Sequence, residues 1–365
     1  MKTLLLGDLS PTIASNSLFA QKDMQTLFND TLSLFEGNDY TVVNLECALT
    51  DHDGAIEKFG PALKATKTVA EVLKDLHVDC CGLSNNHIFD FGKKGALDTM
   101  EALRAAGIAY TGFGDNYEDS RKDFIIEKDG EKIALVAVCE HEYSYALEDR
   151  MGSRPFDEYD TMEDIQKAKL NCDRVIVMYH GGKEECRYPS PRLRKLCRAM
   201  VRHGADVVLC QHSHCIGCYE AFECGHILYG QGNFHFCKSD FMLPEKAPFW
   251  NSALAVHYNT KSNAIAFTPL VNKGAGIELA KGEEKERLLR EFDERNASLL
   301  DGTWQEGWHA FCETKRELYD MVICNYGKEN RTYEETRQFG HFLDCEAHTD
   351  VWRELHKTAN HTNEK

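Results

Sequence analysis

The chain has 365 residues and a formal net charge of −17 at pH 7, so it is long enough for one large α/β domain or for a domain with an appendage. This excess of acidic groups argues against electrostatic binding of nucleic acid or of an anionic membrane, because both need a basic surface. No apolar run approaches the roughly 20 residues of a membrane-spanning helix, and the first residues lead into a strand, so we expect a cytoplasmic protein without a membrane span.

The first half of the chain alternates apolar runs, which are typical of strands, with segments of helical periodicity. We expect strands at 2–6, 40–43, 78–83 and 108–111, helices at 24–36, 68–76 and 92–106, and an exposed loop at 54–67. Polar side chains follow three of the strands: Asp8 the first, Glu46 the second, and Asn86 with His87 the third. In α/β sheets the loops at the carboxyl ends of strands are where ligands bind.

The second half continues this pattern. Asp129-Gly130 joins predicted strands at 121–127 and 132–138 as a hairpin, which we place near the middle of the sheet. Strands at 174–178 and 207–210 lead into His180 and into His212-Ser213-His214, and helices are expected at 162–172 and 191–203. With further strand pairs at 218–222/226–229 and 253–258/264–269, two mixed halves are expected to form one layered α/β sandwich.

The composition changes at about residue 273, where Glu, Lys and Arg become dominant and strand signals end. We expect surface helices at 283–299 and 315–325 and a disordered tail after His356. The chain is therefore divided into a domain of residues 1–272 and a helical carboxy-terminal extension of residues 273–365.

The 15 cysteines are interpreted as free thiols in a reducing cytosol, because many of them lie inside predicted strands and helices. Cys215 and Cys218 have the spacing of a zinc knuckle. No matching second pair follows them, so core thiols are favoured over a structural zinc site.

The polar residues at the strand ends have side chains that suit a divalent cation. They are Asp8, Glu46, Asn86, His180, His212 and His214. Carboxylate, amide and imidazole groups bind one or two ions such as manganese, zinc or iron. The two rings of the H-x-H sequence, on a segment expected to be extended, could serve two neighbouring ions, with Glu46 between them. Each residue also has a purely structural interpretation as a cap or turn, and it is their recurrence at successive strand ends that favours a metal site.

Taken in order, these blocks resemble the bacterial CapA-type capsule synthesis (poly-gamma-glutamate synthesis) proteins over about residues 1–270. The blocks are Gly7-Asp8, Asn44-Leu45-Glu46, Ser84-Asn85-Asn86-His87 with Asp90, His180-Gly181-Gly182, His212-Ser213-His214 and Gly232-Asn233-Phe234. That family is similar to calcineurin-like metallophosphoesterases, which implies a four-layer αββα sandwich with a dimetal centre between the sheets.

The resemblance also implies roles. Asp8 and His214 would bind a first ion, Asn86, His180 and His212 a second, and Glu46 would lie between them. His87 would be the general acid, oriented by Asp90. The chain departs from the phosphoesterase pattern, because Asp8-Leu9-Ser10 lacks the histidine of the usual D-x-H and a glutamate replaces the usual bridging aspartate. Both one ion and two ions are consistent with this set.

Four residues are candidates for binding substrate: Lys183, Arg187, His141 and Asn233. We expect a metal-dependent hydrolase that acts on a phosphoester, or on an amide or peptide-like bond of a polyanionic polymer. The alternative is a non-catalytic, metal-containing binding or assembly protein for capsule or poly-gamma-glutamate synthesis. The acidic net charge counts against direct binding of a polyanion, because like charges repel.

Overall fold

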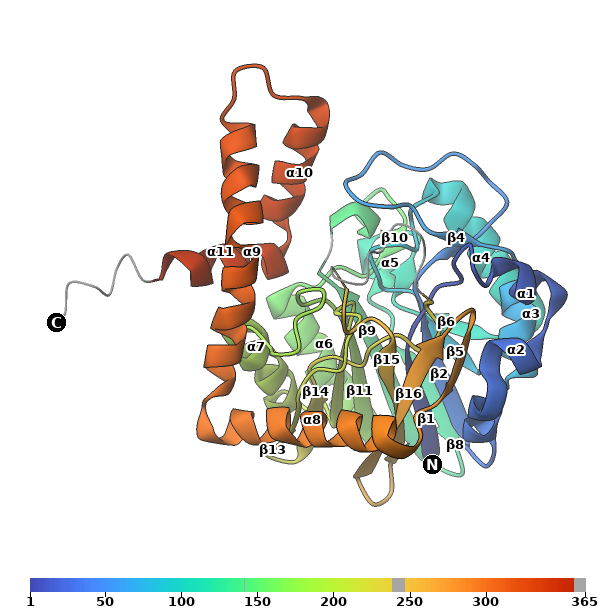
Figure 1. The fold of residues 1–365 in the computed structure, drawn as a ribbon. Helices are drawn as coiled ribbons and strands as arrows, with labels where there is room; N and C mark the ends of the chain where they lie inside the picture. The colour runs from blue at the N-terminus through green and yellow to red at the C-terminus, as the bar shows by residue number, and fades with distance from the viewer. Residues whose placement is uncertain (141, 238–246, 358–365) are drawn as a thin grey trace.

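Two β-sheets lie face to face in the computed structural model, which describes residues 1–140, 142–237 and 247–357 (Figure 1). The first sheet has seven strands in the order β17-β16-β15-β1-β2-β5-β6. Its strands are β1 (Lys2–Leu9), β2 (Tyr40–Leu45), β5 (Cys80–Gly82), β6 (Ala109–Thr111), β15 (Ser252–Asn259), β16 (Ala264–Lys273) and β17 (Gly276–Leu279). β1, β2, β5 and β6 are parallel, whereas β15, β16 and β17 pair in antiparallel fashion.

The second sheet has six strands in the order β13-β14-β12-β11-β9-β8. They are β8 (Phe124–Lys128), β9 (Glu131–Cys139), β11 (Arg174–His180), β12 (Val207–Gln211), β13 (Tyr219–Phe222) and β14 (Gly225–Leu228). β9, β11, β12 and β14 are parallel, and an antiparallel strand closes each edge. Two short pairs lie outside these sheets, β3 (Ala48–Leu49) with β4 (Lys64–Ala65) and β7 (Phe113–Gly114) with β10 (Gly152–Ser153).

Helices cover the outer face of each sheet. They are α1 (Asn16–Gln21), α2 (Met24–Phe28), α3 (Thr68–Asp75) and α4 (Gly92–Ala106) on the first sheet, and α6 (Glu158–Asn171) and α7 (Pro191–Arg202) on the second, while α5 (Tyr117–Ser120) packs on β7. Leu4 and Leu6 of β1 face the first set of helices, while Leu5 between them faces the second sheet, because successive side chains of a strand point to opposite sides. The order helix, sheet, sheet, helix confirms the four-layer αββα sandwich.

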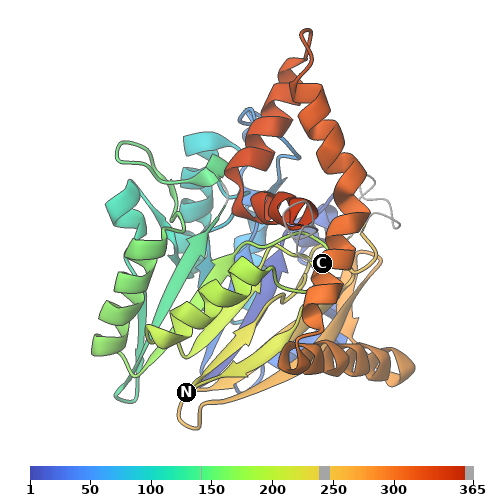
Figure 2. The ribbon, with the colours of Figure 1, turned by 90° about the vertical axis from the view of Figure 1, so that its left-hand side faces the viewer.

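Four helices follow the last strand: α8 (Gly282–Asp301), α9 (Trp304–Tyr326), α10 (Tyr333–Asp344) and α11 (Glu346–His356). α8 packs Leu288 and Phe292 against the core between the sheets, whereas α9, α10 and α11 lie beside the sandwich and share a separate core with its residue Cys186 (Figures 1 and 2). β17 extends the first sheet beyond residue 272, and most of the tail after His356 lies outside the described residues. None of the described helices is long and apolar enough to cross a membrane.

Three local expectations were wrong. The hairpin of β8 and β9 occupies an edge of the second sheet, because β9 pairs with β11 on its other side. The expected helix at 24–36 ends at Phe28 and continues as a 3₁₀ helix over Asn29–Phe35, because Asn29 adopts a positive φ of 44° that an α-helix does not allow. The loop at 54–67 is not wholly exposed, since Lys58 is buried.

Candidate metal centre

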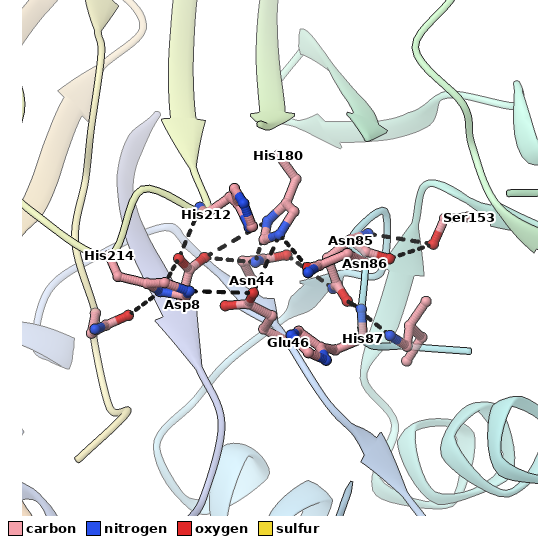
Figure 3. Close-up of polar contacts among 12 residues, drawn as sticks. Asp8, Asn44, Glu46, Asn85, Asn86, His87, Ser153, His180, His212 and His214 are labelled. Atoms are coloured by element: carbon pink, nitrogen blue, oxygen red, sulfur yellow. Dashed lines mark hydrogen bonds and ion pairs between the residues drawn. The ribbon is translucent and has the colours of Figure 1, made fainter. Parts of the chain in front are cut away.

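The carboxyl ends of four strands meet between the two sheets, and their polar side chains form one buried cluster (Figure 3). Asp8 is the last residue but one of β1, Glu46 follows β2, His180 ends β11, and His212 and His214 follow β12. Ligand atoms of Glu46, His180 and His212 lie within 4.8 Å of one another, and so do those of Asp8, Glu46 and His214. Glu46 is common to both sets. The strand ends therefore bring together the residues that the sequence singled out.

Glu46 provides the test of whether a cation fits this cluster. Its side chain has no solvent exposure, and neither carboxylate oxygen accepts a hydrogen bond from the described residues. The nearest imidazole nitrogens are His180 Nε2 at 3.3 Å and His214 Nε2 at 3.9 Å. Since a buried carboxylate is costly without compensation, and carboxylate and imidazole groups are ligands of divalent metals, the residues fit such an ion.

A β-bulge aims Asp8 into the cluster. The register of β1 against β2 shifts between Leu6 and Asp8, at Gly7. A Cβ atom on Gly7 would lie 2.1 Å from the carbonyl oxygen of Gly232, so only glycine allows this approach. The shift turns Asp8 toward the second sheet, where its Oδ2 accepts a hydrogen bond from the backbone N–H of His212 at 3.0 Å.

Asp8 is held as a carboxylate. Burial alone would raise its pKa, but the close imidazoles of His214 and His180 and a hydrogen bond from Asn44 outweigh burial, so the pKa lies below its ordinary value. Asn44 Nδ2 donates to Asp8 Oδ1 at 2.7 Å and lies 3.2 Å from His180 Nδ1. Burial lowers the pKa of His214, but the carboxylates of Glu46 and Asp8 outweigh it and raise the value to about 9. Asn44 had no role in the sequence analysis, although it stands two residues before Glu46.

The expectation that His212 and His214 lie on an extended segment was wrong. His212 has a φ of +80° and His214 a φ of +53°. Both rings turn toward the same cluster, with centroids 5.7 Å apart (Figure 3). Residues with side chains seldom adopt such angles, which cost roughly 1–3 kcal/mol each, and two of the candidate ligands adopt them.

Two successive residues of the loop after β5, Asn85 and Asn86, make different contacts. The Oδ1 atom of Asn85 accepts hydrogen bonds from the backbone N–H groups of His87 and Ile88, and its Nδ2 donates to the carbonyl oxygen of Leu45 at 2.8 Å, so Asn85 shapes the loop. Asn86 instead faces the cluster, with its Oδ1 2.9 Å from His180 Nε2.

His87 lies beside the cluster in a buried triad with Asp90 and Lys58. Its Nδ1 is 2.7 Å from Asp90 Oδ2 and 3.2 Å from Lys58 Nζ, and Lys58 forms an ion pair with Asp90 Oδ1. Burial and the charge of Lys58 outweigh the attraction of Asp90 and lower the pKa of His87. Burial would raise the pKa of Asp90, but His87 and Lys58 lower it below its ordinary value. The sequence analysis missed Lys58, because a lysine in a Gly- and Pro-containing segment reads as a solvated loop residue.

A cavity of about 420 Å³ opens on this cluster. Asn86, His87 and His212 line its inner end, and Lys58, Lys183 and Glu184 line its sides. The remaining lining residues include members of α9, α10 and α11. Glu184 also forms a third candidate ligand set with His212 and His214, and the charge of Lys183 lowers the pKa of Glu184 to about 2.

The four candidate substrate-binding residues lie in different places. Lys183 lines the cavity. Arg187 is absent from the lining; it pairs with Glu291 at 2.7 Å and lies over the ring of Phe249. Asn233 is fully buried and its Oδ1 lies 2.9 Å from His214 Nδ1, so it holds a candidate ligand. His141 lies outside the described residues.

The sequence that carries this site is similar to the sequences of a known protein family. Residues 2–238 match the family described as "Bacterial capsule synthesis protein PGA_cap". The chain is 28% identical over 240 residues to the capsule biosynthesis protein CapA of Bacillus anthracis, which covers 63% of this chain and 57% of that protein. It is 28% identical over 237 residues to the PGA biosynthesis protein CapA of Bacillus subtilis, which covers 63% and 62% of the two chains. The matched region thus spans about three fifths of the length of these relatives.

Two solved structures align with most of this chain at low sequence identity. A putative 5'-nucleotidase from Staphylococcus aureus, in complex with alpha-ketoglutarate, aligns with a TM-score of 0.47 and 12% identity over 80% of this chain and 58% of that one. A hypothetical protein from Thermus thermophilus aligns with a TM-score of 0.43 and 16% identity over 78% of this chain and 100% of that one. Neither likeness is close enough to support an inference about activity.

Proposed function

The chain belongs to the bacterial capsule synthesis protein family, and from that premise we propose that it is a metal-dependent hydrolase. Its substrate is a phosphoester or a polyanionic polymer of capsule or poly-gamma-glutamate metabolism. The names of the relatives refer to capsule and PGA biosynthesis. That this chain acts in the same kind of metabolism is part of the proposal.

The observation that carries the proposal is the buried carboxylate of Glu46, which accepts no hydrogen bond from the described residues and faces two imidazoles. The residues that would hold one or two divalent ions around it are Asp8, Glu46, Asn86, His180, His212 and His214. A divalent ion bound there would lower the pKa of water and would supply a positive charge that stabilises the negative charge developing on the reacting group.

The triad of His87 supplies the proton chemistry. Because Nδ1 faces Asp90, the ring has Nε2 left to exchange a proton with the substrate. In the general-acid role the imidazolium of His87 releases the Nε2 proton to the leaving oxygen. Asp90 orients the ring, while burial and Lys58 favour release of the proton because they lower the pKa of His87. His87 lines the inner end of the cavity beside Asn86, where a substrate held at the cluster would reach it.

The test is the substitution His87→Ala, assayed on generic phosphomonoesters and phosphodiesters with added Mn²⁺. We expect turnover to fall by roughly 10²–10⁴-fold while the metal content of the purified protein stays unchanged. His52→Ala is the matched control, because His52 is exposed. Full activity of the His87→Ala protein would contradict the assigned role.

The same assay separates the hydrolase from the non-catalytic alternative. If the parent protein, fully loaded with metal, turns over neither phosphoesters nor γ-linked glutamate oligomers, the binding or assembly role is favoured. Metal content is measured on the same samples, so an inactive protein without metal is not mistaken for a non-enzyme.

A further inference from the structure

The outer wall of the cavity is built by the carboxy-terminal helices, which lie beyond the family match that ends at residue 238. α9 contributes Lys315 and Tyr319, α10 contributes His341 and Phe342, and α11 contributes His348. Figure 2 shows these helices beside the sandwich. The cavity above the metal cluster is therefore incomplete without residues from the extension.

This wall is fixed to the sandwich by buried polar contacts. Asp350 of α11 accepts hydrogen bonds from Ser190 Oγ at 2.6 Å and from Arg192 Nε at 2.9 Å, at the start of α7. Phe59, in the loop that carries Lys58, packs edge-to-face against Phe342 of α10 with ring centroids 6.2 Å apart. The lining residues of α9 and α10 are thus held in place over the cavity.

Three lysines line the cavity, and their partners differ. Lys58 pairs with Asp90, and Lys183 pairs with Glu184 at 3.0 Å. Lys315 is partly buried and forms no ion pair with a carboxylate of the described residues; its Nζ lies 5.3 Å from the ring centroid of Phe311.

Burial and the charge of Lys183 lower the pKa of Lys315, and the charges of Glu184 and Glu185 act in the opposite direction without outweighing them. Glu184 already forms an ion pair with Lys183. Glu185, the other acid of the lining, is buried and accepts a hydrogen bond from the backbone N–H of Phe249 at 2.9 Å. Lys315 is thus the one lysine of the cavity lining whose ammonium has no carboxylate within ion-pair distance among the described residues, and such an ammonium favours an anionic ligand.

We propose that Lys183 and Lys315 form an anion subsite in the wall of the cavity, which binds a carboxylate or phosphate group of the substrate. The role of this subsite rests on the proposed function, because the bound anion would be part of the substrate and would lie beside the group that reacts at the cluster. An ammonium binds such a group as a point charge, so both anions are of suitable chemistry.

Binding rather than turnover tests the subsite. Isothermal titration of the purified chain with inorganic phosphate and, separately, with tri-γ-glutamate is done with Mn²⁺ and again after chelation, when no metal coordinates the probe. In the chelated chain we expect Lys315→Gln to weaken binding of the preferred probe about 10-fold, because one cation of the pair is lost. Lys315→Arg, which keeps the charge, should stay within about 3-fold of the parent. Lys285→Gln, the same change at an exposed position of α8, should have no effect.

Tighter binding of phosphate assigns the subsite to a phosphoryl group, and tighter binding of tri-γ-glutamate assigns it to a carboxylate. Equal affinity of the parent and Lys315→Gln for both probes would overturn the subsite, as would a parent that binds neither probe. The hydrolase proposal fails by a different result, since a chain without turnover can still bind phosphate through Lys315. Circular dichroism of each variant separates loss of the subsite from loss of the fold.

Discussion

Replacing Glu46 with glutamine tests the metal centre most directly, because the change keeps the shape of the side chain and removes its charge. Glu46 belongs to two of the three three-residue ligand sets found among the described residues, so the substitution takes one charged member from each of these two. Loss of a group that only supports a ligand typically costs 10–100-fold in metal affinity, so loss of a ligand shared by both sets is expected at the upper end, about 100-fold.

The effect is large enough for a thermal assay. With Mn²⁺ supplied at about 1,000 times its Kd, the parent gains about 4.1 kcal/mol of stability, and a 100-fold weaker site retains about 1.4 kcal/mol. At roughly 2 °C per kcal/mol for a chain of this size, the metal-induced rise in Tm should fall from about 8 °C to about 3 °C.

The measured quantity is the difference in Tm between metal-loaded and chelated samples of the same protein, so any change that Glu46→Gln makes to the metal-free fold cancels. Glu71→Gln is the control, because Glu71 forms an exposed ion pair with Lys22 away from the cluster. A metal-induced rise equal to that of the parent would refute the assignment of Glu46 as a ligand. Metal analysis after gel filtration provides an independent check.

Three further predictions concern the surroundings of the site. Lys58→Met should lower the free energy of unfolding by about 3 kcal/mol in urea titration, because it leaves buried Asp90 without its cation, whereas Lys64→Met, which breaks an exposed pair, should cost less than about 1 kcal/mol. Asn233→Ala should weaken Mn²⁺ binding roughly 10–100-fold in calorimetry, because its side chain holds a candidate ligand; unchanged affinity would remove that role. Burial raises the pKa of Glu346 to about 7, so the folded chain binds this proton more tightly than the unfolded chain, and the stability it contributes is lost as pH rises from about 4.5 to 7. Glu346→Gln should therefore be more stable than the parent by about 1–3 kcal/mol at pH 8 and equal to it at pH 4, as chemical denaturation at the two pH values will tell.

The positions of the strands and the identity of the clustered residues were predictable because both follow from local patterns. In β1, Leu4 and Leu6 pack against helices and Leu5 packs against the other sheet, so the strand reads as a continuous apolar run. Such a run ends where the buried layer ends, and the polar residue that follows, such as Asp8, lies at the edge between the sheets.

Features that depend on distant residues were not predictable in this way. The positive φ angles at His212 and His214 arise from packing around the cluster, and no local pattern distinguishes them from an extended segment. Lys58 is buried only because the loop folds back on Asp90, 32 residues later. The edge position of the β8–β9 hairpin depends on the pairing of β9 with β11, which a turn signal does not encode.

Metal binding and anion binding are assigned to residues in different parts of the chain. The clustered carboxylates and imidazoles lie within residues 2–238, the part that matches the family, whereas Lys315 and its neighbouring wall residues lie in α9, α10 and α11, beyond that match. Substitutions in the cluster should therefore change metal binding and leave the anion preference of the chelated chain intact, while substitutions in the wall should change anion binding and leave the metal-induced rise in Tm intact. Asp350 is buried against α7, so the wall belongs to the same folded unit as the sandwich. A substitution in the wall is therefore expected to change the geometry of the cavity and not to release the helices from the sandwich. If instead Lys315→Gln reduced the metal-induced rise in Tm as much as Glu46→Gln does, the two properties would be coupled and their division between cluster and wall would fail.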